Sequence, residues 1–317
     1  MHFNHKNHFR THGKLGNKIL FVFSLSLFIF ACNGGKKEAN TIKKLKITVT
    51  TGMIASVVAE IVQEKASIKT LMGAGTDPHL YKATSQDMQD LKYADLVFYN
   101  GLHLEGKLND ILEKLGKNNP IFAVANALGE RDIMYQDQSP DPHIWFDVQL
   151  WQKVASYIAN TLGKIDKEHD AFYQNNAKKY VEKLTKLHLE VKEALAKIPQ
   201  KSRVLVTAHD AFGYFGKAYQ VEVRGLQGIS TMSEYGLRDI ADLTTFLVKR
   251  GVKAVFVESA VSSNSLEAVV KGCLQKGHRV KIGGTLYADA LGAKNTEAGS
   301  YVGMVRENVR TITKALQ

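Results

Sequence analysis

The fold of this chain is decided by a stretch that reads SIKTLMGAGTDPHLY, residues 67–81. Residues 67–72 are rich in apolar and β-branched side chains, which predicts a strand. The strand leads into Asp77-Pro78-His79, in which the proline fixes its own φ and pushes the residue before it toward extended conformations. We therefore expect His79 to be presented from a stiffened loop after a strand, which suits a ligand that must be held still.

The same tripeptide occurs again as Asp141-Pro142-His143, although the chain has only five prolines. A third histidine, His209, follows the apolar run of residues 204–208, where a strand would end. These histidines are far apart in sequence but share one kind of setting. We infer a metal site assembled from distant loops.

Strands and helices alternate through the first half of the chain. Strands are expected at residues 45–50, 67–72, 95–99 and 121–125, with helices at 53–65 and 107–115. Thr84 is expected to cap a further helix, with Asp87 completing a capping box. Such alternation predicts a parallel sheet flanked by helices, and ligands of such sheets bind beyond the carboxyl ends of the strands. His79 falls at that edge, and His143 lies in a later loop that could fold back to it.

A long helix is expected in the middle of the chain, after a helix at residues 149–162. Between residues 167 and 197, apolar side chains recur at steps of three and four, and neither glycine nor proline interrupts them. A helix of that length measures about 45 Å. We expect it to join two halves of the molecule as a stiff spine, and therefore to allow only small relative motion.

The second half repeats the alternation of the first. Strands are expected at residues 203–208, 221–226, 254–258 and 279–282, and helices at 212–219, 233–250 (capped by Ser233), 265–276 and 301–316. The sequence thus predicts an α/β protein with two (β/α) lobes, each built on a parallel sheet, joined by one long rigid helix. The expected segments are a first lobe at 45–165, the linking helix at 166–199 and a second lobe at 200–317.

The N-terminus is typical of a targeting segment. Residues 1–18 are polar and basic, and residues 19–31 are apolar except for two serines. This apolar run is too short to span a bilayer but suits a secretory signal. Its end, Ala31-Cys32, looks like a bacterial lipobox, which implies a signal peptide at 1–31, cleavage before Cys32 and a lipid on its sulfur. Residues 32–44 are expected to form a flexible tether. The alternative is an ordinary signal peptide with an incidental cysteine.

Composition excludes two other classes of protein. The net charge is +11, or +7 without the first 31 residues, and the basic residues are not gathered with aromatic ones on one face. A nucleic-acid partner is therefore not expected. Two cysteines are too few for a disulfide framework, and Cys273 is expected to be a small buried apolar residue.

The candidate ligands suit a transition metal. Three histidines and one carboxylate fit zinc in a four-coordinate site, and also manganese. His79 and His143 would come from the first lobe and His209 from the second. Asp289 is the best carboxylate by position, because it follows the last strand. The metal would then lie between the lobes.

Other polar residues near these positions are candidates for supporting roles. Asp77 and Asp141 could orient the histidines that follow them, or cap turns. His103 and Glu258 follow predicted strands and are candidates for the surroundings of the site. Three further histidines have polar neighbours on helices or turns and are expected to be solvated: His169, His188 and His278.

Several of these segments resemble one family of proteins. The segments are Gly75–Tyr81, Asp141–Trp145, His209–Phe215, Gly225–Thr231 and Gly283–Tyr287. They are similar to the zinc/manganese-binding lipoproteins of bacterial ABC importers, the solute-binding proteins of the TroA/ZnuA type. The similarity runs from about residue 45 to the C-terminus. It implies two lobes joined by a rigid helix with the metal between them, and it carries the ligand positions over as His79, His143, His209 and Asp289.

The resemblance also implies a setting for the protein. The expected partners are an ABC importer permease with its ATPase, and the expected location is outside the cytoplasm, on a membrane through a lipid at Cys32. We expect a monomer that is not an enzyme. Zinc-dedicated members often carry a loop rich in histidine and acid, which is missing between His103 and His143, and manganese-dedicated members often have Glu where His209 stands. The sequence is thus similar to the branch that takes zinc and manganese, and zinc should bind an N₃O site more tightly.

Two other functions remain as alternatives. A zinc hydrolase would need three protein ligands, an open position for water and a general base. Four candidate ligands argue instead for a closed capture site. A surface lipoprotein can also be an adhesin that binds host molecules, but no feature of the sequence supports that function.

Overall fold

The computed structural model describes residues 44–317. The predicted signal peptide, the lipidated Cys32 and nearly all of the tether lie outside the described residues. Among the described residues, none of the helices combines the length and the apolar character that crossing a membrane requires.

The first sheet has four parallel strands in the order β2-β1-β3-β4. They are β1 (Leu45–Val49), β2 (Ala66–Thr70), β3 (Leu96–Tyr99) and β4 (Ile121–Ala123), connected through α1 (Gly52–Val62), α2 (Ser85–Lys92) and α3 (Lys107–Gly116). The Thr84–Asp87 capping box at the start of α2 is present as predicted. Strand β4 is shorter than expected because residues 124–127 form a 3₁₀ turn.

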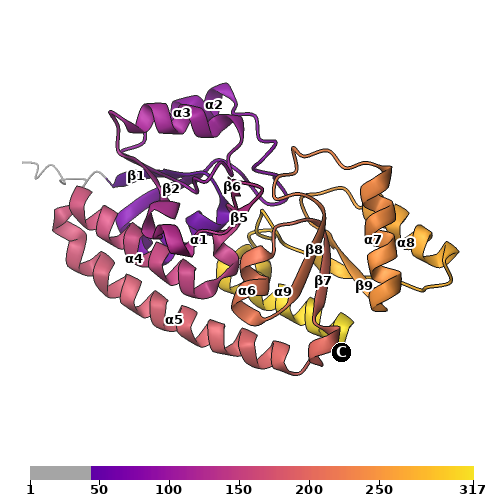
Figure 1. Cartoon of the computed structure of the whole chain (residues 1–317). Helices are drawn as coiled ribbons and strands as arrows, with labels where there is room; N and C mark the ends of the chain where they lie inside the picture. The colour runs from indigo at the N-terminus through magenta and orange to yellow at the C-terminus, as the bar shows by residue number, and fades with distance from the viewer. Residues whose placement is uncertain (1–43) are drawn as a thin grey trace, which may run out of the picture. The chain divides into compact units, whose positions relative to one another are not determined.

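The second sheet is also parallel, in the order β10-β9-β7-β8. Its strands are β7 (Val204–His209), β8 (Glu222–Gln227), β9 (Ala254–Glu258) and β10 (Lys281–Leu286). The helices of this half are α6 (Gly213–Tyr219), α7 (Leu237–Arg250), α8 (Asn264–Gln275) and α9 (Tyr301–Leu316). The predicted α/β class with two parallel sheets is confirmed (Figure 1).

Two boundaries in the second half were predicted wrongly. Helix α7 begins at Leu237 and not at Ser233, because Gly236 is its first flanking residue and donates its N–H to the Asp239 carboxylate. Strand β10 begins at Lys281 and continues through Gly283 and Gly284, with a register shift against β9 between Ile282 and Gly284. We expected those glycines to follow the strand.

The predicted spine is helix α5 (Asp170–Ala196), with 27 residues. It follows α4 (Val148–Ile165) and a 3₁₀ turn at residues 167–169, so it starts slightly later than expected. At 1.5 Å per residue it is about 40 Å long. Helix α5 packs against α1 and α4 on the side of the first sheet and against α6 and α9 on the side of the second (Figure 1). One long helix joining the two sheets is therefore confirmed.

The largest hydrophobic core is shared by both sheets. It includes Ile47 of β1, Trp151 of α4, Leu187 of α5 and Phe256 of β9. Two smaller clusters lie on other faces of the sheets. Cys273 is buried in one of them, as predicted for a small apolar residue.

A short hairpin that we did not predict precedes the second Asp-Pro-His. Strands β5 (Tyr135–Gln136) and β6 (Ser139–Pro140) are antiparallel. The two residues between them, Asp137 and Gln138, both have positive φ (47° and 71°), as a tight hairpin turn requires. The hairpin delivers the chain directly to Asp141.

Candidate metal centre

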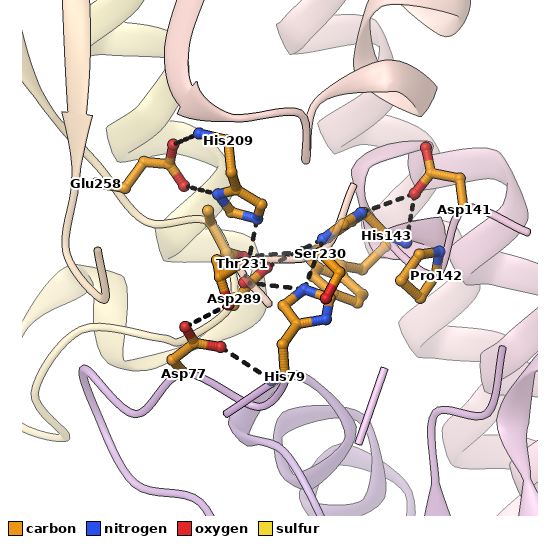
Figure 2. A network of polar contacts seen from close by, with 12 residues as sticks. Asp77, His79, Asp141, Pro142, His143, His209, Ser230, Thr231, Glu258 and Asp289 are labelled. Atoms are coloured by element: carbon orange, nitrogen blue, oxygen red, sulfur yellow. Dashed lines mark hydrogen bonds and ion pairs between the residues drawn. The ribbon is translucent and has the colours of Figure 1, made fainter. Parts of the chain in front are cut away.

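The four predicted ligands meet at the carboxyl ends of the two sheets. His79 lies in the loop after β2, and His143 lies in the loop after β6. His209 is the last residue of β7, and Asp289 follows β10 by three residues. All four are buried, with at most 3% of each residue exposed. Figure 2 shows their side chains pointing toward one another. We call this group the four-residue centre.

The spacing of the ligand atoms can be compared with that of a metal site. One ligand atom from each residue lies within 4.8 Å of all the others. The Nε2 atoms of His79 and His143 are 3.4 Å apart, and Asp289 Oδ1 lies 3.4 Å from His143 Nε2. Asp289 Oδ2 lies 3.5 Å from His79 Nε2 and 3.2 Å from His209 Nε2. Bonds of about 2.0–2.1 Å in a tetrahedron place ligand atoms about 3.3 Å apart, so the centre fits one zinc-sized ion.

Several of these atoms have no hydrogen-bond partner among residues 44–317. They are His209 Nε2 and both carboxylate oxygens of Asp289. Buried polar groups without partners cost free energy, and native proteins normally satisfy them. A cation held between these atoms would satisfy all three at once.

Asp141 orients the ring of His143. Its Oδ1 lies 2.7 Å from His143 Nδ1 and also accepts the His143 backbone N–H at 2.9 Å. The acceptor at Nδ1 fixes the proton there and leaves Nε2 free to face the centre. We considered that Asp141 orients His143 or caps a turn, and its contacts with the ring and with the backbone N–H are of both kinds.

Glu258 supports His209 in the same way but with two oxygens. Its Oε2 lies 2.5 Å from His209 Nδ1, and its Oε1 accepts the His209 backbone N–H at 2.9 Å. Glu258 is the last residue of β9 and is buried. These contacts are the ones expected of a residue that supports a ligand from the surroundings of the site.

Asp77 supports the loop of His79 rather than its ring. Its Oδ1 accepts the His79 backbone N–H at 2.9 Å, and its Oδ2 accepts the hydroxyl of Thr231 at 2.6 Å. No hydrogen bond among the described residues links Asp77 to the imidazole of His79. Asp77 therefore caps the turn and ties it to the loop after β8.

The charges around the centre shift the pKa values of its members. Burial opposes charge at every position, and it lowers the pKa of His79 to about 3. At His143 the carboxylates of Asp141 and Asp289 outweigh burial and raise the pKa to about 9. Glu258 and Asp289 likewise raise the pKa of His209, and the two charged histidines hold that of Asp289 well below its usual range. The carboxylates of Asp141, Glu258 and Asp289 thus favour positive charge at the centre.

The remaining histidines lie elsewhere. His103 is exposed and is not one of the four clustered residues, so its candidate role in the surroundings of the site stays a prediction. The expectation that three other histidines are solvated was wrong, because each is half-buried with a polar partner. The partners are Asp166 for His169, Tyr219 for His188 and the Val252 carbonyl for His278.

Two aromatic residues that we did not single out support Asp289. The indole N–H of Trp145 donates to the Ala288 carbonyl at 3.1 Å, and the hydroxyl of Tyr301 donates to the Trp145 carbonyl at 2.6 Å. Trp145 follows His143 by two residues, so it connects the second Asp-Pro-His loop to the loop of Asp289. The only sequence signal that could have pointed to Trp145 as a supporting residue was its position close to His143.

Comparisons with known proteins agree with this geometry. Residues 47–315 match the family model of ZnuA, described as the periplasmic component A of a zinc-uptake complex. The manganese-binding lipoprotein MntA of Bacillus subtilis is 47% identical, over 93% of this chain and 97% of its own. The zinc-binding protein TroA of Treponema pallidum is 41% identical, over 89% of this chain and 92% of its own. The solved structure of the Treponema pallidum TroA superposes with a TM-score of 0.84, covering 86% of this chain and 99% of that one.

Proposed function

The chain belongs to the ZnuA family of zinc-uptake components, and we propose that it captures one divalent transition metal ion at the four-residue centre and passes it to an ABC importer permease. Membership of this family makes the chain a metal-binding, solute-binding component of an importer rather than an enzyme, with the ion as its cargo. The observation that carries the proposal is the convergence of four buried ligand atoms within 4.8 Å of one another.

We infer that the centre accepts both zinc and manganese. One relative is named for manganese and another for zinc. Three imidazole nitrogens and a carboxylate suit both ions, and zinc stands above manganese in the general order of affinity. The ion that is transported then depends on which metal is available as well as on affinity.

We further infer the setting of the protein from its family and its N-terminus. A lipid on Cys32 would anchor a monomer to a membrane, facing the periplasm or the cell exterior, with residues 33–44 as a tether. The expected lobes are residues 45–165 and 200–317, with residues 166–199 linking them. The permease and its ATPase would receive the ion from the edge where both lobes contribute ligands.

A titration tests the proposed function. The full chain, purified in detergent and stripped of metal with a chelator, is titrated with Zn²⁺ and Mn²⁺ separately and then in competition. We expect one ion per chain, and a loss of affinity of about tenfold or more in His209→Ala, because one arm of the chelate is removed. His169→Ala is the matched control, since that histidine contacts Asp166 away from the centre. Binding that is absent, or equally weakened by both substitutions, would refute the proposal.

A further inference from the structure

The loop Asn100–Gly106, which follows β3, has an unusual backbone. Four of its residues have positive φ: Gly101 (81°), Leu102 (55°), His103 (63°) and Gly106 (49°). Glycine adopts such angles freely, but Leu102 and His103 do so only against a steric cost. Strained conformations of this kind persist where the surrounding contacts determine them, and they often lie at functional sites.

Glu105 holds this loop closed. Its side chain is fully buried, and its Oε1 accepts the backbone N–H of Asn100 at 2.6 Å and the hydroxyl of Thr50 at 2.8 Å. Its Oε2 accepts the backbone N–H of Gly101 at 3.3 Å. One carboxylate therefore draws the two ends of the loop together and fixes them to the residue that follows β1.

The closed loop contacts both Asp-Pro-His segments. The amide of Asn100, which is 1% exposed, donates to the Pro142 carbonyl at 2.9 Å, directly before His143. At the other end, Gly106 packs so closely on the His79 backbone that a Cβ on Gly106 would lie 2.3 Å from the His79 carbonyl oxygen. A single segment thus touches the main chain of one candidate ligand and the main chain adjoining another.

We propose that the loop Asn100–Gly106 sets the separation of His79 and His143 and thereby tunes which metal ion the centre prefers. Asn100, Glu105 and Gly106 are positioning residues in this proposal, which rests on the proposed metal-capture function. The two Nε2 atoms, 3.4 Å apart, form one edge of the ligand polyhedron. A shift of either loop changes that edge, and ions that differ in size and preferred geometry respond to it differently.

Asn176 provides a matched control for Asn100. Both are buried asparagines, and each donates its side-chain amide to a carbonyl of a distant segment at 2.9 Å, Pro142 for Asn100 and Ile61 for Asn176. Asn100 also donates to the Gly101 carbonyl of its own loop at 3.1 Å. Asn100→Ala and Asn176→Ala each remove one long-range hydrogen bond of equal length, and both should lower the melting temperature. Only Asn100→Ala removes one beside a candidate ligand.

The experiment measures Zn²⁺ and Mn²⁺ affinities and the visible absorption spectrum of the Co²⁺ complex for the full-length wild type and both variants. We expect Asn100→Ala to lose about tenfold or more in zinc affinity, the range for residues that orient ligands, and to change both the zinc-to-manganese ratio and the Co²⁺ bands. Asn176→Ala should leave all three as in the wild type. Gly106→Ala, which pushes on the His79 carbonyl from the other end, should alter the same spectrum.

The possible results distinguish a failure of this inference from a failure of the proposed metal-capture function. If the wild type binds one ion but Asn100→Ala and Asn176→Ala have the same zinc affinity, the same zinc-to-manganese ratio and the same Co²⁺ spectrum, the positioning role is refuted and metal capture stands. If the wild type binds no metal, metal capture itself fails and the positioning role fails with it. A changed spectrum and metal ratio in Asn100→Ala alone would establish the loop as a determinant of metal preference.

Discussion

Replacing Glu258 by glutamine is the most informative single change at the centre. The carboxylate of Glu258 has two oxygens, and each faces one nitrogen of His209: Oε1 faces the backbone N–H at 2.9 Å, and Oε2 faces ring Nδ1 at 2.5 Å. With a carboxylate in place, both nitrogens can donate. The proton then resides on Nδ1 of the ring, and Nε2 is left with a lone pair for a metal ion.

Glutamine has the same shape but only one acceptor oxygen. If its NH₂ group faces Nδ1, the proton of the neutral ring moves to Nε2, where it blocks the atom that would bind the metal. If its NH₂ group faces the backbone N–H instead, a buried donor is left without an acceptor, at a cost of about 1–3 kcal/mol. Either arrangement penalises the metal complex or the fold. We expect the zinc affinity of Glu258→Gln to fall about 10–100-fold.

Asp141→Asn is the contrasting variant. A single oxygen of Asp141, Oδ1, accepts both from the His143 backbone N–H and from ring Nδ1. Asparagine can place its one oxygen there and keep both bonds, so the loss in zinc affinity should stay below about tenfold, the low end for residues that support ligands. Competition against a fluorescent zinc chelator measures both affinities, and ¹⁵N spectra of the imidazoles report the tautomers. A Glu258→Gln protein that binds zinc as the wild type does, or more tightly than Asp141→Asn, would refute this reasoning.

Three further changes test other parts of the structure. Thr231→Val removes the hydroxyl that donates to Asp77 at 2.6 Å, a hydrogen bond that contributes about 1 kcal/mol to holding the two loops together. Its loss should speed metal release several-fold in stopped-flow chelation, and an unchanged rate would contradict this expectation. Burial raises the pKa of Glu105 from 4.5 to about 7, so its protonation stabilises the fold fully below about pH 4.5 and this contribution is lost as the pH rises through 7. Urea unfolding at pH 5 and pH 8 should show a difference of about 2–3 kcal/mol from this group, and Glu105→Gln should lack it. Trp145→Phe leaves the Ala288 carbonyl without its indole donor and should cost about 1–3 kcal/mol of unfolding free energy; a smaller loss would mean that another group replaces the indole.

The three histidines of the centre could be predicted because each carries a local signal, whereas Asp289 was chosen only by its position after the last strand. His79 and His143 are marked by the repeated Asp-Pro-His, and His209 by its place at the end of an apolar strand. In parallel sheets the carboxyl ends of the strands share one edge, so such residues are brought together by topology alone. Their role as ligands stays a prediction until metal binding is measured.

Glu105 could not be predicted, because its setting depends on contacts that are distant in sequence. A glutamate in a loop between two glycines is expected to be solvated. Its burial depends on Thr50 after β1 and on the left-handed backbone of Leu102 and His103, residue types that do not signal such a conformation. Only the packed structure shows that this carboxylate organises the loop.

Strand β10 shows the same limit for the fold. A strand is usually predicted to end where two glycines follow each other, because glycine has a low strand propensity. Here the strand continues through Gly283, and glycine is needed at this position because a larger residue would not fit. A Cβ on residue 283 would lie 2.8 Å from the Ala315 side chain of α9 and 2.9 Å from the Phe256 side chain. The requirement for glycine comes from the helix packed on the strand, which the local sequence does not reveal.

The position of the largest core bears on how the centre could open. Residues of both sheets and of α5 belong to one continuous hydrophobic cluster, so a hinge between the sheets would expose apolar surface along the spine. Two ties near the centre are of another kind: Thr231 on Asp77 and Gln136 on Asp210 are single hydrogen bonds that are not fully buried, unlike the buried bond from Trp145 to Ala288. Each contributes only about 1 kcal/mol, far less than the core. Movement of the segments of Thr231 and Gln136 is therefore a less costly route for an ion to leave than separation of the lobes, and a partner that releases the metal is expected to act on these segments.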